Sequence, residues 1–406
     1  MPGSLCVAPT QTSNGPRLAA VLRDGIHRLP LGLSPHHWKV LRALLGCRTG
    51  ALGGQVCRCE DCHCDHFEPF ACRNRHCPDC QGHQARQWLE QQQGCLLPVP
   101  YFHLVFTLPH ALNRLVGQNL ASLGDLLFEC ASQTLLQLGR QRLGVQLGLT
   151  AVLHTWGQSL VEHYHVHLIV TGGGLSAKGS WKGLKNPHYL FPVRVLSKIF
   201  RGKFCAGLQR LYARGKLQFV GALAPLAQIL AFQALVRKAT LGPWVVYAKA
   251  PFAGPETVLK YLSQYTHRVA ISSRRLISLD TQVHRVCFRY RDYADGHRIK
   301  TMSLDTGEFT RRFCQHILPR GFTKLRHYGL LANRGRTERL EKARAALGVA
   351  IPAPPDAALP LSDSVLSEKS GDPAKFRRCP YCGGLKLRVI QILRPPNWRL
   401  PGGDSS

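Results

Sequence analysis

Three histidines alternate along the segment HYHVHLIVTGGG, which begins at His163. Successive side chains of a β-strand point to opposite faces, so His163, His165 and His167 would share one face and the intervening residues the other. Imidazoles two residues apart on a rigid strand can hold one cation between them. A polar strand edge with solvated imidazoles is the alternative to a metal site.

Two tyrosines in the segment YLSQYTHRV, Tyr261 and Tyr265, are four residues apart, so they would project from one face of a helix. Two half-buried core tyrosines are the ordinary interpretation of that spacing. Beside a metal-binding strand, however, a tyrosine hydroxyl could attack a phosphodiester and form a covalent phosphotyrosine. Such a bond keeps the phosphodiester energy, so rejoining needs no ATP, and the chain has no G-x-x-x-x-G-K-[ST] loop.

The cysteines offer a second kind of metal chemistry. Eight of the sixteen lie between Cys47 and Cys80. In a reducing compartment such clusters indicate metal binding or catalysis more often than disulfides. Two C-x-x-C pairs, Cys59/Cys62 and Cys77/Cys80, are separated by fourteen residues, a spacing typical of a zinc ribbon with four thiolate ligands. A redox site is the alternative.

Other residues leave this ligand set open. Six neighbours could replace a ligand or hold a second metal: Cys57, Cys64, Cys72, His63, His66 and His76. The distant pair Cys379/Cys382 is half a zinc knuckle, which either stands alone or closes on Cys or His elsewhere in the chain.

Composition narrows the class of protein. The chain has 406 residues, of which 45% are hydrophobic, which excludes a disordered tail protein. Its 53 Lys and Arg against 23 Asp and Glu give a net charge of +30, which points to nucleic acid as the partner. No uninterrupted run of about 18 apolar residues is present, and the N-terminus does not resemble a signal peptide. We therefore expect no membrane association and a cytoplasmic, nucleoid-associated location.

Basic residues near the candidate sites could contact phosphate. The run RNRH precedes Cys77, and between residues 260 and 344 there are 19 Lys and Arg against seven Asp and Glu. A solvated basic loop is the alternative for the RNRH run. The candidate DNA contacts are Arg73, Arg75, Arg268, Arg274 and Arg275.

The elements that must position these residues follow from periodicity and turn signals. Ser34 followed by Pro35 predicts a helix start. Residues 281–314 read as β-rich, with turns at the DG and TG dipeptides, and glycines 172–174 are expected to end the histidine strand. Other strands are predicted at 101–109, 150–160 and 244–252, and helices at 84–96, 111–148 and 255–270. Because strands and helices intermix without βαβ alternation, we predict an α+β fold with a mostly antiparallel sheet.

In combination, these motifs resemble a known family. HYHVHLIVTGGG, followed by FPVRVLSKIFRGKF and YLSQYTHRVAIS, is similar to the insertion-sequence-91 family of transposases. These are rolling-circle enzymes with two tyrosines and an HUH (His-hydrophobe-His) pair. CRTGALGGQV and CRNRHCPDCQ resemble the N-terminal zinc-binding domain of that family. The resemblance covers about residues 20–335.

The resemblance implies an HUH nuclease fold, with its histidines on a central antiparallel strand and its tyrosines on a helix facing them. It makes His165 and His167 the metal-binding pair and Tyr261 and Tyr265 the nucleophiles. Where the family usually shows His-Pro-His-x-His, this chain has Tyr164 in the position of the proline, which leaves the metal face intact.

The metal ligands implied are of two kinds. The zinc ligands would be Cys59, Cys62, Cys77 and Cys80. HUH sites are completed by a third ligand, for which His163 is the first choice, ahead of Gln158, Gln264 and Glu256. The catalytic ion would be Mg²⁺ or Mn²⁺.

The expected domains are a helical lead-in (1–46), a zinc-binding domain (47–95), an HUH two-tyrosine catalytic domain (96–345), and a Pro-rich linker and tail with a C-x-x-C knuckle (346–406).

The expected function is rolling-circle DNA transposition: nicking and joining of single-stranded transposon ends through a 5′-phosphotyrosine, with help from the host replication machinery. The alternatives are a plasmid-type HUH replication initiator or relaxase, and a catalytically inactive, zinc-dependent DNA-binding protein.

Overall fold

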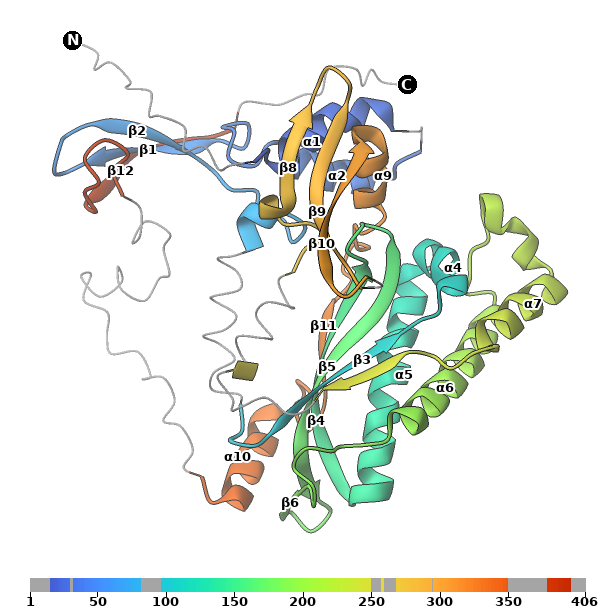
Figure 1. Ribbon diagram of the computed structural model, residues 1–406. Helices are drawn as coiled ribbons and strands as arrows, with labels where there is room; N and C mark the ends of the chain where they lie inside the picture. Colours follow the sequence, from blue (N-terminus) through green and yellow to red (C-terminus); the bar gives the residue numbers. More distant parts are fainter. Residues whose placement is uncertain are drawn as a thin grey trace. The chain divides into compact units, whose positions relative to one another are not determined.

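The computed structural model describes residues 15–29, 32–81, 96–249, 257–258, 268–293, 295–349 and 378–395. The chain forms two compact units (Figure 1). Residues 271–314 and the C-terminal residues belong to the same unit as the N-terminal part of the chain. The boundaries of the two units therefore differ from those of the expected catalytic domain, 96–345. The first unit comprises Met1–Gln87, Ile271–Cys314 and Ala353–Ser406, and the second comprises Trp88–Ala270 and Gln315–Pro352.

The second unit is built on a six-stranded sheet with the order β11-β4-β5-β3-β7, and with β6 paired to β5. Every adjacent pair is antiparallel, which confirms the predicted α+β class. The longest strand, β5, is in the middle of the sheet and carries the alternating histidines. The strands are β3 (Tyr101–Thr107), β4 (Val145–Trp156), β5 (Glu162–Ser176), β6 (Trp181–Gly183), β7 (Val246–Lys249) and β11 (Leu325–Gly329).

Helices pack against one face of this sheet. Tyr164, Val166 and Leu168 of β5 are fully buried there, in a core that also contains Phe128 and Phe200 from the helices. Figure 1 shows α5 and α6 side by side along the sheet. The helical segments are η2 (His110–Leu112), α4 (Asn113–Gln118), α5 (Leu120–Leu138), η3 (Gly139–Leu143), α6 (Val193–Ala213), η4 (Gly221–Ala227) and α7 (Ile229–Thr240). Among the described helices, none is long and apolar enough to cross a membrane.

The predicted alternation of β5 is therefore confirmed: the apolar residues enter the helical core, and the histidines occupy the other face. A smaller buried cluster lies on the histidine face, where Tyr101 and Ile169 of the sheet pack with Val258 and with Leu340 of α10 (Arg336–Leu347). Each buried side chain of this size stabilises the fold by about 1.5–3 kcal/mol.

The glycines of β5 do not end the strand, contrary to the prediction. The strand continues through residues 172–174 to Ser176. A Cβ atom on Gly174 would lie 2.2 Å from the carbonyl oxygen of Gln146, and one on Gly172 would lie 2.9 Å from that of Pro100. The glycines therefore allow neighbouring backbones to approach closely, rather than interrupting the sheet.

The first unit contains short helices and two three-stranded sheets. Ser34 caps α2 by accepting a hydrogen bond from the His37 amide, as predicted. The predicted TG turn is wrong, because Asp305 accepts from the Gly307 and Glu308 amides and so starts a helix. The elements are α1 (Leu18–Gly25), η1 (Ile26–Arg28), α2 (Pro35–Leu45), η5 (Ser273–Arg275), β8 (Leu276–Asp280), β9 (Arg285–Asp292), β10 (Arg298–Asp305) and α9 (Thr306–Cys314).

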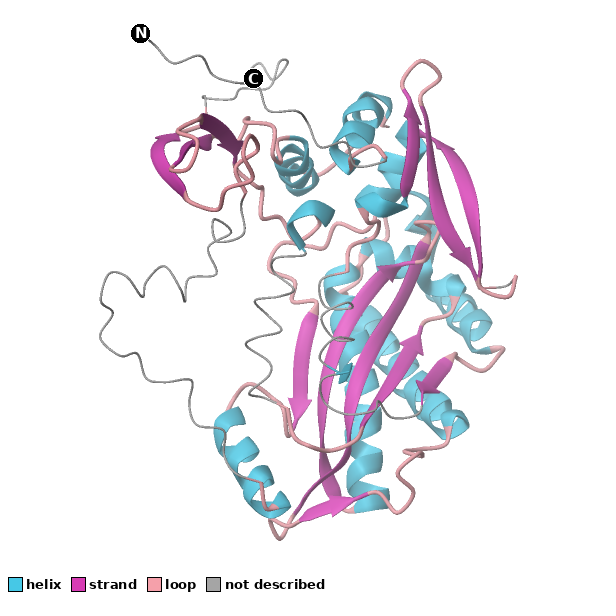
Figure 2. Cartoon of the chain, turned by 60° about the vertical axis from the view of Figure 1, so that its left-hand side comes forward, coloured by secondary structure: helices cyan, strands magenta, loops and turns pink. Residues whose placement is uncertain are grey.

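The other sheet of this unit joins an N-terminal hairpin to a strand from the C-terminal part of the chain. Its order is β12-β1-β2, from β1 (Gly54–Cys59), β2 (Asp65–Pro69) and β12 (Leu387–Leu393). Both pairings are antiparallel, and Cys59 of β1 is directly opposite Leu387 of β12. These strands are the short, strongly curved magenta ribbons at the upper left of Figure 2.

Candidate metal centres and active site

Three imidazoles meet on the face of β4 and β5 that is opposite the helical core. His154 of β4 is the direct cross-strand partner of His165 of β5, and His167 is two residues further along β5. The ring centroid of His167 is 4.5 Å from that of His154 and 4.9 Å from that of His165. One ligand nitrogen from each ring lies within 4.8 Å of the other two, so the three could hold one metal ion.

The protonation state of two of these rings, His165 and His167, favours metal binding. Burial lowers the pKa of His165 to about 3 and holds the pKa of His167 well below its usual value. The positive charge of Arg268 contributes to both shifts. Both imidazoles are therefore neutral near pH 7, which is the form that binds metal.

Hydrogen bonds orient two of the rings. Nδ1–H of His165 donates to the backbone carbonyl of His163 over 2.9 Å, which leaves Nε2 of His165 with a free lone pair. His103 of β3 lies 2.9 Å from His167 (Nε2 to Nδ1), with the rings stacked. Such outer partners fix the tautomer and direction of metal-binding imidazoles.

The third member of the group is His154, not the predicted His163. His163 lies on the same face, and its ring is 4.8 Å from that of His165, but it packs beside His110 and is outside the group. His163 and His167 are four positions apart on one strand, about 13 Å, whereas directly opposed residues on adjacent strands are about 5 Å apart. The signal that sequence reasoning missed is hairpin register: a turn at 157–161 places residue 154 opposite 165.

Both predicted nucleophiles, Tyr261 and Tyr265, lie outside the described residues, as do Gln264 and Glu256. The described residues closest to them in the chain are Val258 and Arg268. Val258 is fully buried in the cluster that contains Ile169 of β5, and Arg268 is close enough to the histidines to lower their pKa values.

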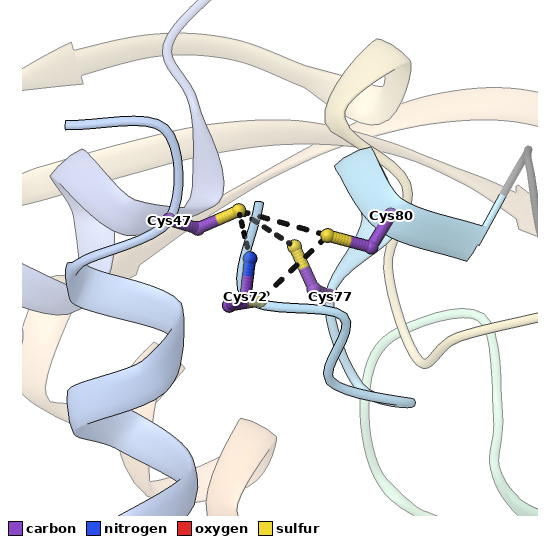
Figure 3. A group of neighbouring side chains, drawn as sticks. All are labelled: Cys47, Cys72, Cys77 and Cys80. Atoms are coloured by element: carbon purple, nitrogen blue, oxygen red, sulfur yellow. Dashed lines mark hydrogen bonds between the residues drawn. The ribbon is translucent and has the colours of Figure 1, made fainter. Parts of the chain in front are cut away.

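Four cysteine sulfurs converge in the first unit, as Figure 3 shows. The sulfur of Cys47 is 3.6 Å from that of Cys77 and 3.7 Å from that of Cys80, and Cys72 is 3.7 Å from Cys80. In a tetrahedral site with Zn–S bonds of 2.3 Å, the sulfurs are about 3.8 Å apart. The spacing therefore fits a four-thiolate zinc site.

The predicted zinc ligand set is wrong in its pairing. Cys77 and Cys80 are brought together with Cys47 and Cys72, whereas Cys59 and Cys62 lie with Cys379 and Cys382. The two C-x-x-C pairs at ribbon spacing do not share a site here: Cys59 ends β1 and Cys62 lies in the turn that follows, where β12 brings Cys379 and Cys382 close to them. Cys47, just after α2, was not among the candidates, since it has no nearby cysteine partner in sequence.

A third group in this unit consists of Cys57, His66 and Glu68 on the β1–β2 hairpin. Cys57 and His66 are direct cross-strand partners, and the Cys57 thiol is 3.5 Å from a Glu68 carboxylate oxygen.

Two family models match the chain. One, described as "Putative transposase", matches residues 148–339, which include the three-histidine group. The other, the "Transposase zinc-binding domain" of the IS91 type, matches residues 21–108, which include Cys47, Cys72, Cys77 and Cys80.

Relatives match over almost the whole chain. "Putative transposase y4qJ" of Sinorhizobium fredii is 41% identical over 93% of this chain and 96% of its own length. The chain is a transposase of the IS91 family. The "Transposase for insertion sequence element IS801" of Pseudomonas savastanoi pv. phaseolicola is 31% identical, over 89% of this transposase and 85% of its own length. No solved structure matches significantly.

The family assignment gives the first cysteine group a role in the transposase. A zinc-binding domain that contains four converging thiolates supports structural zinc at Cys47, Cys72, Cys77 and Cys80. As a transposase, the protein acts on DNA.

The predicted DNA-contacting arginines of the transposase differ in their surroundings. Arg73 and Arg274 are exposed, and Arg75 is half-buried. Arg275 has a structural role, because its Nε donates to the carbonyl of Arg289 and its guanidinium lies over the Phe288 ring. Arg268 is exposed and close to the histidine group.

A buried histidine of the transposase supports the turn between β4 and β5. Nε2–H of His316 donates to the carbonyl of Leu160, and its Nδ1 accepts from the Thr155 hydroxyl. The ring is only 2% exposed, and burial lowers its pKa to about 4. His316 thus ties both ends of the hairpin turn that sets the register of His154 against His165.

This histidine makes the transposase acid-sensitive. An unfolded chain binds a proton at His316 below about pH 6.5, whereas the folded chain does so only near pH 4, so stability falls as the pH falls through this window. His316→Gln is expected to remove up to about 3 kcal/mol of the acid-induced loss of stability between pH 7 and pH 4. Urea-unfolding curves across that range measure it, and parallel pH slopes for the two proteins would contradict it.

Proposed function

We propose that this transposase nicks and joins single-stranded DNA at transposon ends with a tyrosine nucleophile, at an HUH-type site built on β5. The observation that carries the proposal is the group His154, His165 and His167, three imidazoles on one face of the adjacent antiparallel strands β4 and β5. The family match supports the DNA substrate and the transposition reaction.

Described residues on both sides of the tyrosine segment lie near this group. Val258 packs with Ile169, which shares the histidine face of β5, and Arg268 acts electrostatically on His165 and His167. Tyr261 follows Val258 by three residues, and Tyr265 precedes Arg268 by three. Both tyrosines therefore lie in the sequence between two described residues that are near the histidine face.

The chemistry of the donors fits a divalent cation. Three nitrogen ligands suit Mn²⁺ better than Mg²⁺, which prefers oxygen. The cation would neutralise charge on the scissile phosphate and orient it. Arg268 adds a fixed positive charge beside the same position, where it would bind a non-bridging phosphate oxygen.

The reaction then follows from the tyrosines. One tyrosine oxygen attacks phosphorus, the bond from phosphorus to the 3′ oxygen breaks, and the proton of the hydroxyl is transferred to that leaving oxygen. The products are a 5′-phosphotyrosine and a free 3′-OH, which can prime replacement synthesis by the host replication machinery. The second tyrosine cleaves another strand in the same way and releases its 3′-OH. When a free 3′-OH attacks the phosphotyrosine, the new phosphodiester forms as the bond from phosphorus to the tyrosine oxygen breaks, and the proton of the 3′-OH returns to the tyrosine.

The test is a covalent-adduct assay. The protein is mixed with single-stranded DNA that spans the ends of its own element, with Mn²⁺ or Mg²⁺, and run on a denaturing gel beside Tyr261→Phe, Tyr265→Phe and the double variant. We expect a metal-dependent protein–DNA band that is lost in the double variant, because phenylalanine has no nucleophilic oxygen. The two single variants show which tyrosine attacks first.

The same assay can refute the proposal. If DNA that the protein demonstrably binds gives no adduct in either metal, the catalytic interpretation fails, and zinc-dependent DNA binding without cleavage becomes the better account. An adduct that persists in the double tyrosine variant would assign the nucleophile to another residue.

A further inference from the structure

The second cysteine group joins residues from the two ends of the chain. The sulfur of Cys59 is 3.6 Å from that of Cys382, and the sulfur of Cys62 is 3.5 Å from that of Cys379. These pairs are separated by more than 300 residues in the sequence. All four cysteines are free thiols whose ligand atoms lie within 4.8 Å of one another, which is close to the spacing of a tetrahedral four-thiolate site.

Each pair sits in a tight turn with the backbone geometry of a zinc knuckle. In the C-terminal pair, the Gly383 amide donates to the carbonyl of Cys379, and the Gly384 amide points at the Cys382 sulfur. Gly383 has a φ of 75°, a left-handed conformation that favours glycine. In the N-terminal pair, the His63 amide donates to the Cys59 carbonyl, with His63 at a φ of 57°. Amides that surround the sulfurs stabilise thiolates.

Apolar packing is too weak to explain how the C-terminal segment is held. β12 pairs with β1 at the edge of its sheet, and apart from half-buried Leu387 all its residues are exposed. Its large side chains remain in water: Ile392 is 67% exposed, and Val389 and Ile390 are each at least 40% exposed. Closing a chain loop of this length carries a large entropy cost, which exposed strand pairing offsets poorly.

We propose that a second zinc ion binds Cys59, Cys62, Cys379 and Cys382, and that this ion clamps residues 378–395 onto the N-terminal zinc-binding domain. The zinc ribbon of this transposase is thus split: one knuckle comes from the β1–β2 turn and the other from the C-terminal tail. Binding of structural zinc contributes about 10–16 kcal/mol in small zinc domains, enough to hold an otherwise exposed strand. The clamp does not depend on the proposed tyrosine chemistry.

Cobalt substitution tests the metal site directly. Co²⁺ bound by thiolates gives a charge-transfer absorption that counts sulfur ligands and ignores histidine sites. The double variant Cys379→Ser/Cys382→Ser is expected to lose about half of this absorption, corresponding to one of two four-thiolate sites. Cys287→Ser is the matched control, because Cys287 is a half-buried cysteine of the same unit outside the metal groups, and it should retain the full signal. Unchanged absorption in the double variant would overturn the proposal.

A cleavage experiment tests the clamp without relying on variants of the site. A recognition sequence for a site-specific protease is inserted after Asp363 in the full-length protein, and the protein is cut under native conditions. With zinc bound, the C-terminal fragment should stay with the tagged N-terminal part on an affinity column, and a chelator should release it. Release of the fragment from fully zinc-loaded protein would show that no clamp exists.

Discussion

Replacing His154 by alanine is expected to lower metal-dependent cleavage of transposon-end DNA by about 100-fold or more, because it removes one of the three ligands proposed for the catalytic ion. The His154 ring lies beside both His165 and His167, and all three offer ligand nitrogens within 4.8 Å of one another. A Mn²⁺ titration monitored by the electron paramagnetic resonance signal of the free ion should show weaker Mn²⁺ binding in the variant. Adduct formation on transposon-end DNA measures the loss of cleavage.

His163→Ala provides the matched control. The hydrogen bond from His165 Nδ1 ends on the backbone carbonyl of residue 163, which alanine keeps. His163 is also on the same strand face and next to His165, so a general disturbance of this face would affect both variants. We expect His163→Ala to retain most of the metal affinity and cleavage. Equal losses in the two variants would contradict the assignment of His154 as the third ligand.

The second large effect is expected at Cys77. Cys77→Ser removes one of four sulfurs that lie within 4.8 Å of one another, in the part of the chain that matches the transposase zinc-binding domain. Since zinc binding contributes about 10–16 kcal/mol to the folding of small zinc domains, losing a ligand should unfold the surrounding segment. Zinc content should fall, and trypsin should cut rapidly within residues 32–81. Cys77 is 3% exposed, so solvent cannot replace the sulfur without rearrangement.

The control for Cys77 is Cys205→Ser in α6. Cys205 is half-buried, lies in the second unit and belongs to none of the metal groups among the described residues. The Cys205→Ser protein should keep its zinc and its resistance to trypsin. If Cys77→Ser also kept both, the four-thiolate site would not be structural.

Local patterns were sufficient for the features of this transposase that depend on a few consecutive residues. The alternation of β5 separates buried Tyr164 and Val166 from the histidines, because strand side chains alternate whatever the fold. Ser34 caps α2 as predicted, since a cap needs only the next three residues. The antiparallel α+β class and the transposase family also followed from the sequence.

Tertiary structure alone decided which distant residues lie close enough to bind one metal ion. His154 joins His165 through the register of β4 on β5, and register depends on the turn and on the buried face of both strands. The sulfurs of Cys59 and Cys382 lie close together because β12 pairs with β1, which brings the N-terminal and C-terminal parts of the chain into contact. Spacing in sequence specifies neither choice: several cysteines and histidines are equally close along the chain, and only sheet pairing and loop closure bring one set within bonding distance of a single ion.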